Sequence, residues 1–181
     1  MSAGPLRVTI GIDPGQTGAI AVLADGCFVY AHDMPTMPRA AGGHEVNADE
    51  LGRILRIYMR RHTGADFLVA LEHVQAITRR DPKTGKPVQQ GANSNFRFGE
   101  SFGVVRGCVG CLKLPRVLVR PQKWKKHHGL IGKEKDASRA VALNRFPAAG
   151  PQLSRKKDCG RAEAMLMADW AYTTQHAVGV F

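Results

Sequence analysis

Val8-Thr9-Ile10-Gly11-Ile12-Asp13-Pro14-Gly15-Gln16-Thr17-Gly18-Ala19-Ile20-Ala21-Val22 is the stretch that decides the fold. Apolar and β-branched residues lead to a carboxylate, Asp13, and a second apolar run follows a Pro-Gly-Gln-Thr-Gly turn. This pattern predicts two antiparallel strands of a buried sheet, with Asp13 where the first strand ends. A carboxylate at that place is costly unless it is paired or binds a cation. A simpler interpretation is that Asp13 accepts hydrogen bonds from backbone N–H groups of the turn.

Length and composition predict one domain over residues 1–181, with tails at 1–5 and 176–181. A hydrophobic content of 44% is ample for the core of a chain of this size. No run of about 18 apolar residues is present, and the first residues do not have the pattern of a signal peptide. The four cysteines are too few and too scattered for a disulfide framework. We therefore expect a non-secreted protein of a reducing compartment.

The net charge of +11 is distributed unevenly along the chain. Residues 1–90 carry 10 Lys and Arg against 9 Asp and Glu, whereas residues 91–181 carry 16 against 6. Neutralisation of phosphates by clustered cations is the main sequence-independent source of affinity for nucleic acid. The second half of the chain therefore predicts a polyanionic partner. The alternative, a basic surface without a partner, is disfavoured because the cations lie beside apolar and aromatic residues.

A second buried strand is predicted over residues 66–74. Its apolar run ends at a second carboxylate, Glu72. Between the strands lie a third antiparallel strand over 27–31, a loop over 35–44 and a helix that begins after Asn47. A helix between strands is the crossover that parallel pairing requires. Asp13 and Glu72 would then lie side by side at one edge of the sheet, where two carboxylates repel each other unless one is protonated or a divalent cation lies between them. We favour the cation over protonation and over an ordinary strand-end role for Glu72.

The remaining elements alternate in the same way. We expect a long helix over 93–112, a short strand over 117–119, and helices over 122–129, 133–146 and 159–170. Glycines recur in the long helix at spacings of four, four and three, which leaves one ridge without side chains; they are Gly99, Gly103, Gly107 and Gly110. Each costs roughly 1 kcal/mol of helix propensity. Close approach by the sheet or by a second subunit would compensate this cost.

Basic residues in three segments are candidates for contacts with a phosphate backbone. Residues 75–92 lack apolar periodicity and predict a mobile basic loop, the helix over 122–129 is basic, and a third basic run precedes the last helix. The nucleic-acid-binding candidates are Arg79, Arg80, Lys83, Lys86, Lys123, Lys125, Lys126, Lys156 and Lys157. Trp124 either stacks on a base or anchors its helix to the core.

The last helix brings two more carboxylates, Asp158 at its start and Glu163 within an apolar face. Asp158 is a good candidate for the helix N-cap. Five residues apart on one helix, the two side chains would point about 140° away from each other. For both to reach one metal centre, Asp158 has to lie before the first turn and fold back.

With Ile12-Asp13-Pro14-Gly15, Leu71-Glu72-His73-Val74 and Lys157-Asp158-Cys159-Gly160-Arg161-Ala162-Glu163-Ala164 in this order, the sequence resembles the RuvC-type Holliday junction resolvases of the RNase H-like superfamily, and most of all their phage and prophage members. The resemblance implies an α/β fold of the ribonuclease H type, with a mixed five-stranded sheet flanked by helices. It also implies a homodimer in the cytoplasm of a bacterium or of a phage-infected host cell, acting in DNA recombination and repair.

For the site, the resemblance implies four acidic residues, Asp13, Glu72, Asp158 and Glu163, that bind two Mg²⁺ or Mn²⁺ ions. The implied reaction is in-line attack of a metal-activated water on a phosphodiester of branched DNA. The last pair departs from the family pattern, in which the final two ligands are three residues apart, because Asp158 is five residues before Glu163.

Two other functions remain open from the sequence. The spacing of Asp158 and Glu163 is compatible with a junction-binding protein that cleaves weakly or not at all. The segment Gly11-Ile12-Asp13-Pro14-Gly15-Gln16-Thr17-Gly18 also resembles the first phosphate loop of actin-like kinases and ATPases. That interpretation requires a second phosphate loop and a glycine-rich adenosine site, which the sequence lacks, and it leaves the basic second half unexplained.

Overall fold

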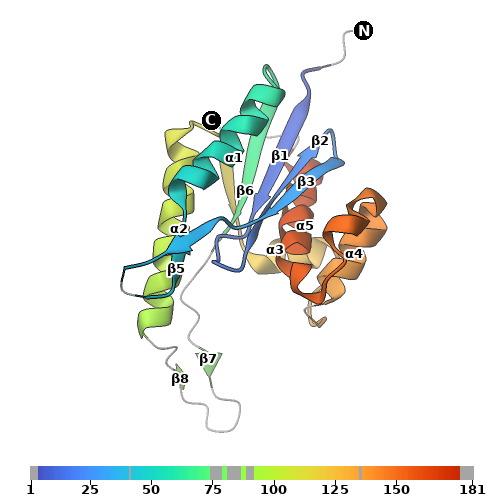
Figure 1. Ribbon diagram of the computed structural model, residues 1–181. Coiled ribbons are helices and arrows are strands. Elements are labelled where there is room, and N and C mark those ends of the chain that lie inside the picture. The colour runs from blue at the N-terminus through green and yellow to red at the C-terminus, as the bar shows by residue number, and fades with distance from the viewer. Residues whose placement is uncertain are drawn as a thin grey trace.

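The computed structural model describes residues 4–40, 42–73, 79–80, 87–88, 92–134 and 136–175. Within them lies a five-stranded mixed sheet with the strand order β3-β2-β1-β6-β9. The first three strands pair antiparallel, and β6 pairs parallel with both β1 and β9 (Figure 1). The mixed five-stranded sheet predicted from the sequence is confirmed.

The sheet strands are β1 (Arg7–Ile12), β2 (Ala19–Ala24), β3 (Cys27–Asp33), β6 (Asp66–Glu72) and β9 (Arg116–Val119). Two small hairpins pair β4 (Thr36–Pro38) with β5 (His44–Val46) and β7 (Arg79–Arg80) with β8 (Pro87–Val88). The helices are α1 (Ala48–Arg61), α2 (Ala92–Cys111), α3 (Pro121–His127), α4 (Ala137–Arg145) and α5 (Cys159–Thr174), with 3₁₀ turns at Pro147–Gln152 and Lys156–Asp158.

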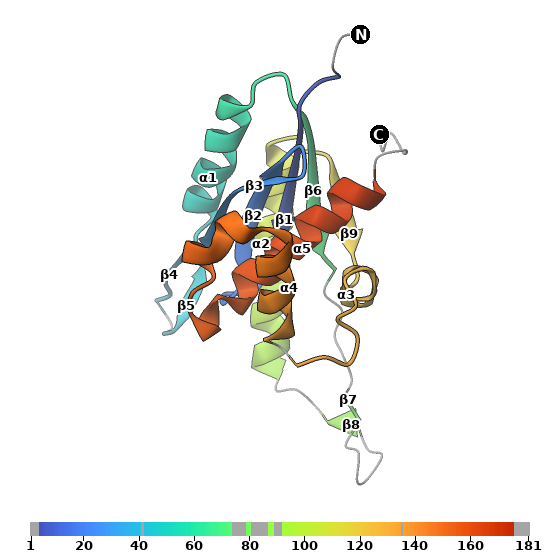
Figure 2. The ribbon, with the colours of Figure 1, turned by 90° about the vertical axis from the view of Figure 1, so that its right-hand side faces the viewer.

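The sheet separates two layers of helices, and each layer has its own core. Val8, Ile10 and Ile12 point from β1 into a core shared with α1 and α2. Residues of the opposite strand face, such as Ala21 and Leu23, pack with α4 and α5. Figure 2 shows the second layer in front of the sheet, with α1 and α2 behind it. The alternation of side chains along a strand accounts for this division.

A direct backbone contact joins α5 to β1. At Gly11 a Cβ atom would fall on the carbonyl oxygen of Ala164 and 2.7 Å from the backbone nitrogen of Ala168. Ala164 and Ala168 are fully buried and small, so the helix backbone lies directly on the strand. The absence of a side chain at Gly11 therefore sets the height of α5 above the sheet.

Most elements lie where the sequence predicts them, and two differ. Asn47 caps α1 as expected, since its side chain accepts a 3.0 Å hydrogen bond from the N–H of Glu50. The predicted loop over 35–44 instead contains β4 and leads into β5, because Arg39 forms ion pairs with Glu45 and Glu100 that hold this hairpin against α2. The helix predicted over 133–146 is shorter and begins only at Ala137.

The glycine ridge of α2 does not pack against the sheet. A Cβ atom at Gly99, Gly103 or Gly107 would meet no described atom within 4 Å, and all three residues are exposed. The sequence analysis expects either the sheet or a second subunit to approach this ridge. Among the described residues, the sheet does not do so. None of the described helices is long and apolar enough to span a membrane.

We expect Gly11→Ala to destabilise the fold by about 3 kcal/mol or more, because the added methyl group requires α5 to move away from β1. Urea unfolding measures this change. Gly150→Ala is the matched control, since nothing lies within 4 Å of its added Cβ, and we expect a change within about 0.5 kcal/mol. Equal effects of the two substitutions would contradict the importance of this contact.

Candidate metal centre and nucleic-acid interface

Asp13 and Glu72 lie next to each other at one edge of the sheet. Ile12 is in register with Leu71 on the parallel neighbour, so the residues that follow them emerge from adjacent strands. Adjacent strands are about 4.8 Å apart. Parallel pairing therefore brings the two carboxylates together, as predicted.

The turn after β1 fixes the Asp13 carboxylate. The N–H of Gly15 donates a 3.1 Å hydrogen bond to its Oδ1 atom, so the simple turn interpretation of Asp13 is also correct. Gly18 closes the turn, where a Cβ atom would lie 2.8 Å from the carboxylate carbon of Asp13. The turn thus holds the carboxylate in place and leaves no room for a side chain beside it.

Glu72 is oriented by the buried indole of Trp124. The Nε1–H group donates a 3.0 Å hydrogen bond to Glu72 Oε1, and Trp124 is fully buried. Of the two roles open for Trp124 from the sequence, the structure therefore shows core packing. Burial raises the pKa of Glu72 to about 7, with further contributions from repulsion by Asp13 and by Glu163, and the Trp124 hydrogen bond opposes this rise.

Glu163 approaches Asp13 and Glu72 from α5. Its Oε1 atom lies 3.7 Å from Lys125 Nζ and 3.5 Å from the hydroxyl of Ser138, which donates to it. A pocket of about 320 Å³ adjoins it and is lined by Lys125, Leu130, Lys133, Glu134, Ser138 and Glu163. Three of the four predicted carboxylates thus come from β1, β6 and α5 to one place.

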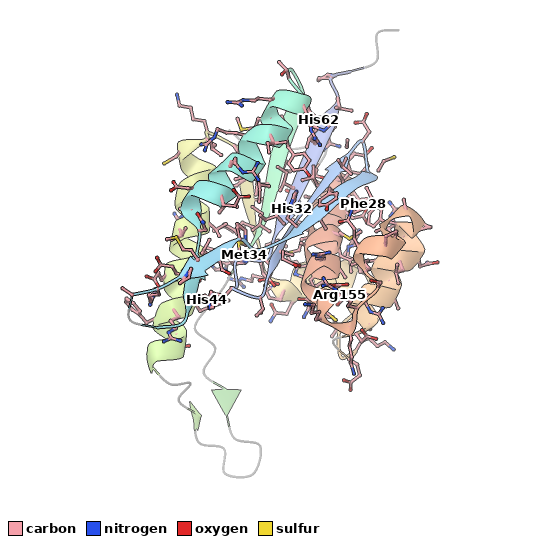
Figure 3. The ribbon with its side chains drawn as sticks, viewed as in Figure 1. Phe28, His32, Met34, His44, His62 and Arg155 are labelled. Carbon is pink, nitrogen blue, oxygen red and sulfur yellow. The ribbon has the colours of Figure 1, made fainter. Side chains whose placement is uncertain are left out.

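The structure places Asp158 in a different set of contacts. It is 2% exposed, and its carboxylate accepts hydrogen bonds from the backbone N–H of Arg155 at 2.8 Å and from the guanidinium at 2.7 and 3.0 Å. These bonds, first of all those from the side chain, lower the pKa of Asp158. Figure 3 shows Arg155 on the side of the sheet that carries α4 and α5. To bind a metal, the Asp158 carboxylate would have to break its hydrogen bonds and its ion pair with Arg155.

Arg161, in the same C-terminal motif, also makes a structural contact. Its guanidinium donates to both carboxylate oxygens of Asp33 at 2.6 and 2.7 Å. This two-bond ion pair ties the start of α5 to the end of β3. It lowers the pKa of Asp33, mainly through the hydrogen bond.

The predicted phosphate-binding residues divide into three groups. Lys123 and Lys126 are exposed on α3, where Lys125 also lies beside the site, and Lys156 and Lys157 are exposed before α5. Lys83 and Lys86 lie outside the described residues, as do the side chains of Arg79 and Arg80 and most of the predicted loop over 75–92.

Sequence reasoning misses three residues near the site and one exposed aromatic residue two positions before one of them. Lys133 and Ser138 line the pocket beside Glu163, but nothing in the sequence of the predicted helix over 133–146 indicates that it lies beside this carboxylate. Phe96 is 71% exposed and Phe98 is 37% exposed at the start of α2. A Cβ atom on Gly15 would lie 3.9 Å from the Phe98 ring, so this ring borders the turn that holds Asp13. The sequence did offer one indication of them: Phe96 and Phe98 stand among polar residues at the start of α2.

Asp13, Glu72 and Glu163 fit a hard divalent cation. Carboxylate oxygens are the ligands that Mg²⁺ and Mn²⁺ prefer. Burial first, and then repulsion by Asp13 and Glu163, raise the pKa of Glu72, and a bound cation would offset this repulsion. The donor set therefore agrees with the metal expected from the sequence.

The fold is that of RuvC. Thermus thermophilus RuvC in complex with a Holliday junction substrate superposes with a TM-score of 0.55 at 16% identity, over 94% of this chain and 96% of that chain. A second Thermus thermophilus RuvC structure gives a TM-score of 0.50 at 13% identity, over 93% and 96%. These identities are low, so the likeness concerns the fold, and the predicted RNase H-like fold is confirmed.

A curated sequence gives a local match. The chloroplastic Holliday junction resolvase MOC1 of Chlamydomonas reinhardtii is 51% identical over 51 residues, which are 28% of this chain and 6% of that protein. The match thus covers only a small part of the curated relative. No family model matches the chain.

We expect the contribution of Glu72 to the stability of the metal-free protein to fall as the pH rises from about 4.5 to 7. In this window the unfolded chain releases the Glu72 proton and the folded chain retains it. Glu72→Gln removes this dependence, so its stability relative to wild type should be greater at pH 8 than at pH 4.5 by on the order of 2 kcal/mol. Urea unfolding in EDTA measures the difference.

Asp66→Asn is the control, because it removes an exposed acid from the other end of the same strand. If Asp66→Asn changed the pH dependence as much as Glu72→Gln, the effect would come from net charge and the prediction would be wrong.

Proposed function

We propose that this protein is a metal-dependent endonuclease that resolves four-way DNA junctions, or related branched DNA, by phosphodiester hydrolysis. The observation that carries the proposal is the convergence of Asp13, Glu72 and Glu163 beside a pocket with two lysines. The RuvC fold and the local match to a Holliday junction resolvase support the same function. The cytoplasmic location expected from the sequence stays a prediction.

Some residues of the site would hold the metal, and others position those ligands. Asp13, Glu72 and Glu163 would hold Mg²⁺ or Mn²⁺, which supplies an activated water and stabilises charge on the phosphate. The Gly15 N–H and the Trp124 indole fix the Asp13 and Glu72 carboxylates before the metal binds. Ser138 and Lys125 do the same for Glu163. The number of ions, expected to be two, is part of the proposal.

Basic and aromatic residues around the pocket suit a DNA backbone. Lys125 and Lys133 line it and offer ammonium groups to a phosphate next to the carboxylates. Lys123 and Lys126 extend the positive surface along α3. The exposed rings of Phe96 and Phe98 offer stacking surfaces for unpaired bases, which a branched substrate presents.

Phosphate binding of the ATPase type is disfavoured by the turn after β1. Such a loop directs its backbone N–H groups at the phosphates. Here the N–H of Gly15 is bonded to Asp13 Oδ1 and the N–H of Gly18 to the carbonyl of Gly15. Two of the amides that a nucleotide would need are thus used within the turn.

We further propose a homodimer that packs through the exposed glycine ridge of α2. Gly99, Gly103 and Gly107 form a ridge open to close approach, and the helix propensity that they cost is offset if another helix lies on them. Two sites related by a twofold axis would cut two strands symmetrically.

The wild-type protein should make paired symmetric nicks in a labelled four-way junction with Mg²⁺ and leave a matched linear duplex intact. Asp13→Asn and Glu163→Gln should lower the cleavage rate at least about a hundredfold, because each removes a ligand charge, and should retain junction binding in a gel-shift assay. Junction binding without cleavage by the wild type in both Mg²⁺ and Mn²⁺ would leave a junction-binding protein.

Asp158→Asn in the same assay tests the fourth carboxylate. Since Asp158 is bonded to Arg155, we expect it to lower stability and to slow cleavage less than tenfold. Loss of cleavage equal to that of Glu163→Gln in a stably folded protein would instead make Asp158 a metal ligand.

Gly103→Arg should convert the dimer into a monomer, measured as mass by light scattering, because the new side chain occupies the ridge. Ala140→Arg is the matched control, as it adds the same charge to an exposed position of α4. A wild-type mass that stays monomeric at all concentrations would contradict the dimer.

A further inference from the structure

A second group of metal-binding side chains lies where α3 ends against α5. His127 and His128 come from the end of α3, and Asp169 comes from the buried face of α5. One ring nitrogen of each histidine and one carboxylate oxygen of Asp169 all lie within 4.8 Å of one another. The two rings are stacked edge to face with their centroids 4.7 Å apart. None of the carboxylates of the proposed nuclease centre belongs to this group.

Neighbouring groups already orient these three side chains. His128 Nε2 lies 2.8 Å from the carbonyl oxygen of Leu166, which only accepts, so this nitrogen carries the proton and Nδ1 carries the lone pair. His127 Nε2 lies 3.2 Å from the Thr173 hydroxyl. Arg145 donates to one oxygen of Asp169, Oδ1, at 3.2 and 3.3 Å. A ring N–H donated to a backbone carbonyl is the usual outer-shell arrangement of a metal-binding histidine.

We propose that His127, His128 and Asp169 form a second metal site, selective for a transition metal such as Zn²⁺ over Mg²⁺. Two imidazoles and a carboxylate are a common zinc ligand set, whereas Mg²⁺ prefers oxygen ligands alone. Ligands around one zinc ion lie roughly 3.4 Å apart, so the separations within the group, which are up to 4.8 Å, have to contract by at most about 1.4 Å. The exposed side chain of His127 provides this movement.

The position of the site gives it a consequence for the nuclease centre. α3 carries Trp124, which holds Glu72, and Lys125, which contacts Glu163, and α3 packs on α5 (Figure 2). The polar contacts between the end of α3 and α5 include those of His128 with the Leu166 carbonyl and of His127 with Thr173. A metal bound there clamps α3 to α5 and restrains the side chains that position two catalytic carboxylates.

Calorimetric titration of Asp13→Asn with Zn²⁺ at pH 7.5 tests the proposal without relying on cleavage. The Asp13 substitution weakens zinc binding at the carboxylate centre. We expect one zinc ion per chain to bind at the second site, and His127→Ala added to this background should weaken that binding at least tenfold. Zinc should also raise the melting temperature of the Asp13→Asn protein, and His127→Ala should abolish this rise.

Two further variants distinguish zinc binding at this site from zinc binding by exposed histidines in general. His44→Ala removes an exposed histidine from β5, which packs against α2 (Figure 3), and should leave zinc binding unchanged. Asp169→Asn should weaken binding as His127→Ala does, provided circular dichroism shows that it is folded. Equal zinc affinity in Asp13→Asn with and without His127→Ala would overturn the proposal, whether or not the protein cleaves DNA.

Discussion

The direct contact between the backbones of α5 and β1 determines the geometry of the candidate site. Gly11 lies near the end of the central strand, and the carbonyl of Ala164 occupies the space of its absent side chain. Glu163 precedes this contact by one residue, and Asp13 follows Gly11 by two. The closest approach of helix and strand therefore also fixes the separation of two of the three carboxylates. A larger side chain at position 11 would change both the core and the site.

Fixing three carboxylates in this way works against stability in the metal-free protein. Glu72 is buried beside Asp13 and Glu163, and its pKa is raised to about 7. The surrounding ion pairs offset this: Arg161 binds Asp33, and Arg155 binds Asp158, so the start of α5 is held to β3 and to its own preceding turn. Arginines thus fix the helix that carries Glu163, while lysines lie nearer the pocket, where a phosphate would bind. This division agrees with the rigid, two-bond geometry of Arg and the single mobile charge of Lys.

The sequence was sufficient for the sheet and for the pair of carboxylates at its edge, because both follow from local patterns. Apolar strands that end in Asp13 and Glu72, with a capped helix between them, leave few topologies once right-handed crossovers are required. The partners of these residues could not be predicted. Trp124 and Glu72 are 52 residues apart, and nothing in either segment indicates their contact. The surroundings of Asp158 were missed because a carboxylate next to lysines suits a ligand or a cap equally well, and the choice of Arg155 depends on the 3₁₀ turn before α5.

α3 shows how one short element can serve several purposes. Its basic sequence predicts contact with DNA, yet only the side chains that point away from the sheet are exposed. Within a single turn Trp124 enters the core and bonds Glu72, and Lys125 reaches Glu163. The histidines that end the helix meet Asp169 on α5. Because a helix of seven residues has little stability of its own, its orientation depends on these contacts. The placement of Glu72 therefore depends on how firmly both ends of α3 are attached, which links the transition-metal site proposed at one end to the carboxylate centre at the other.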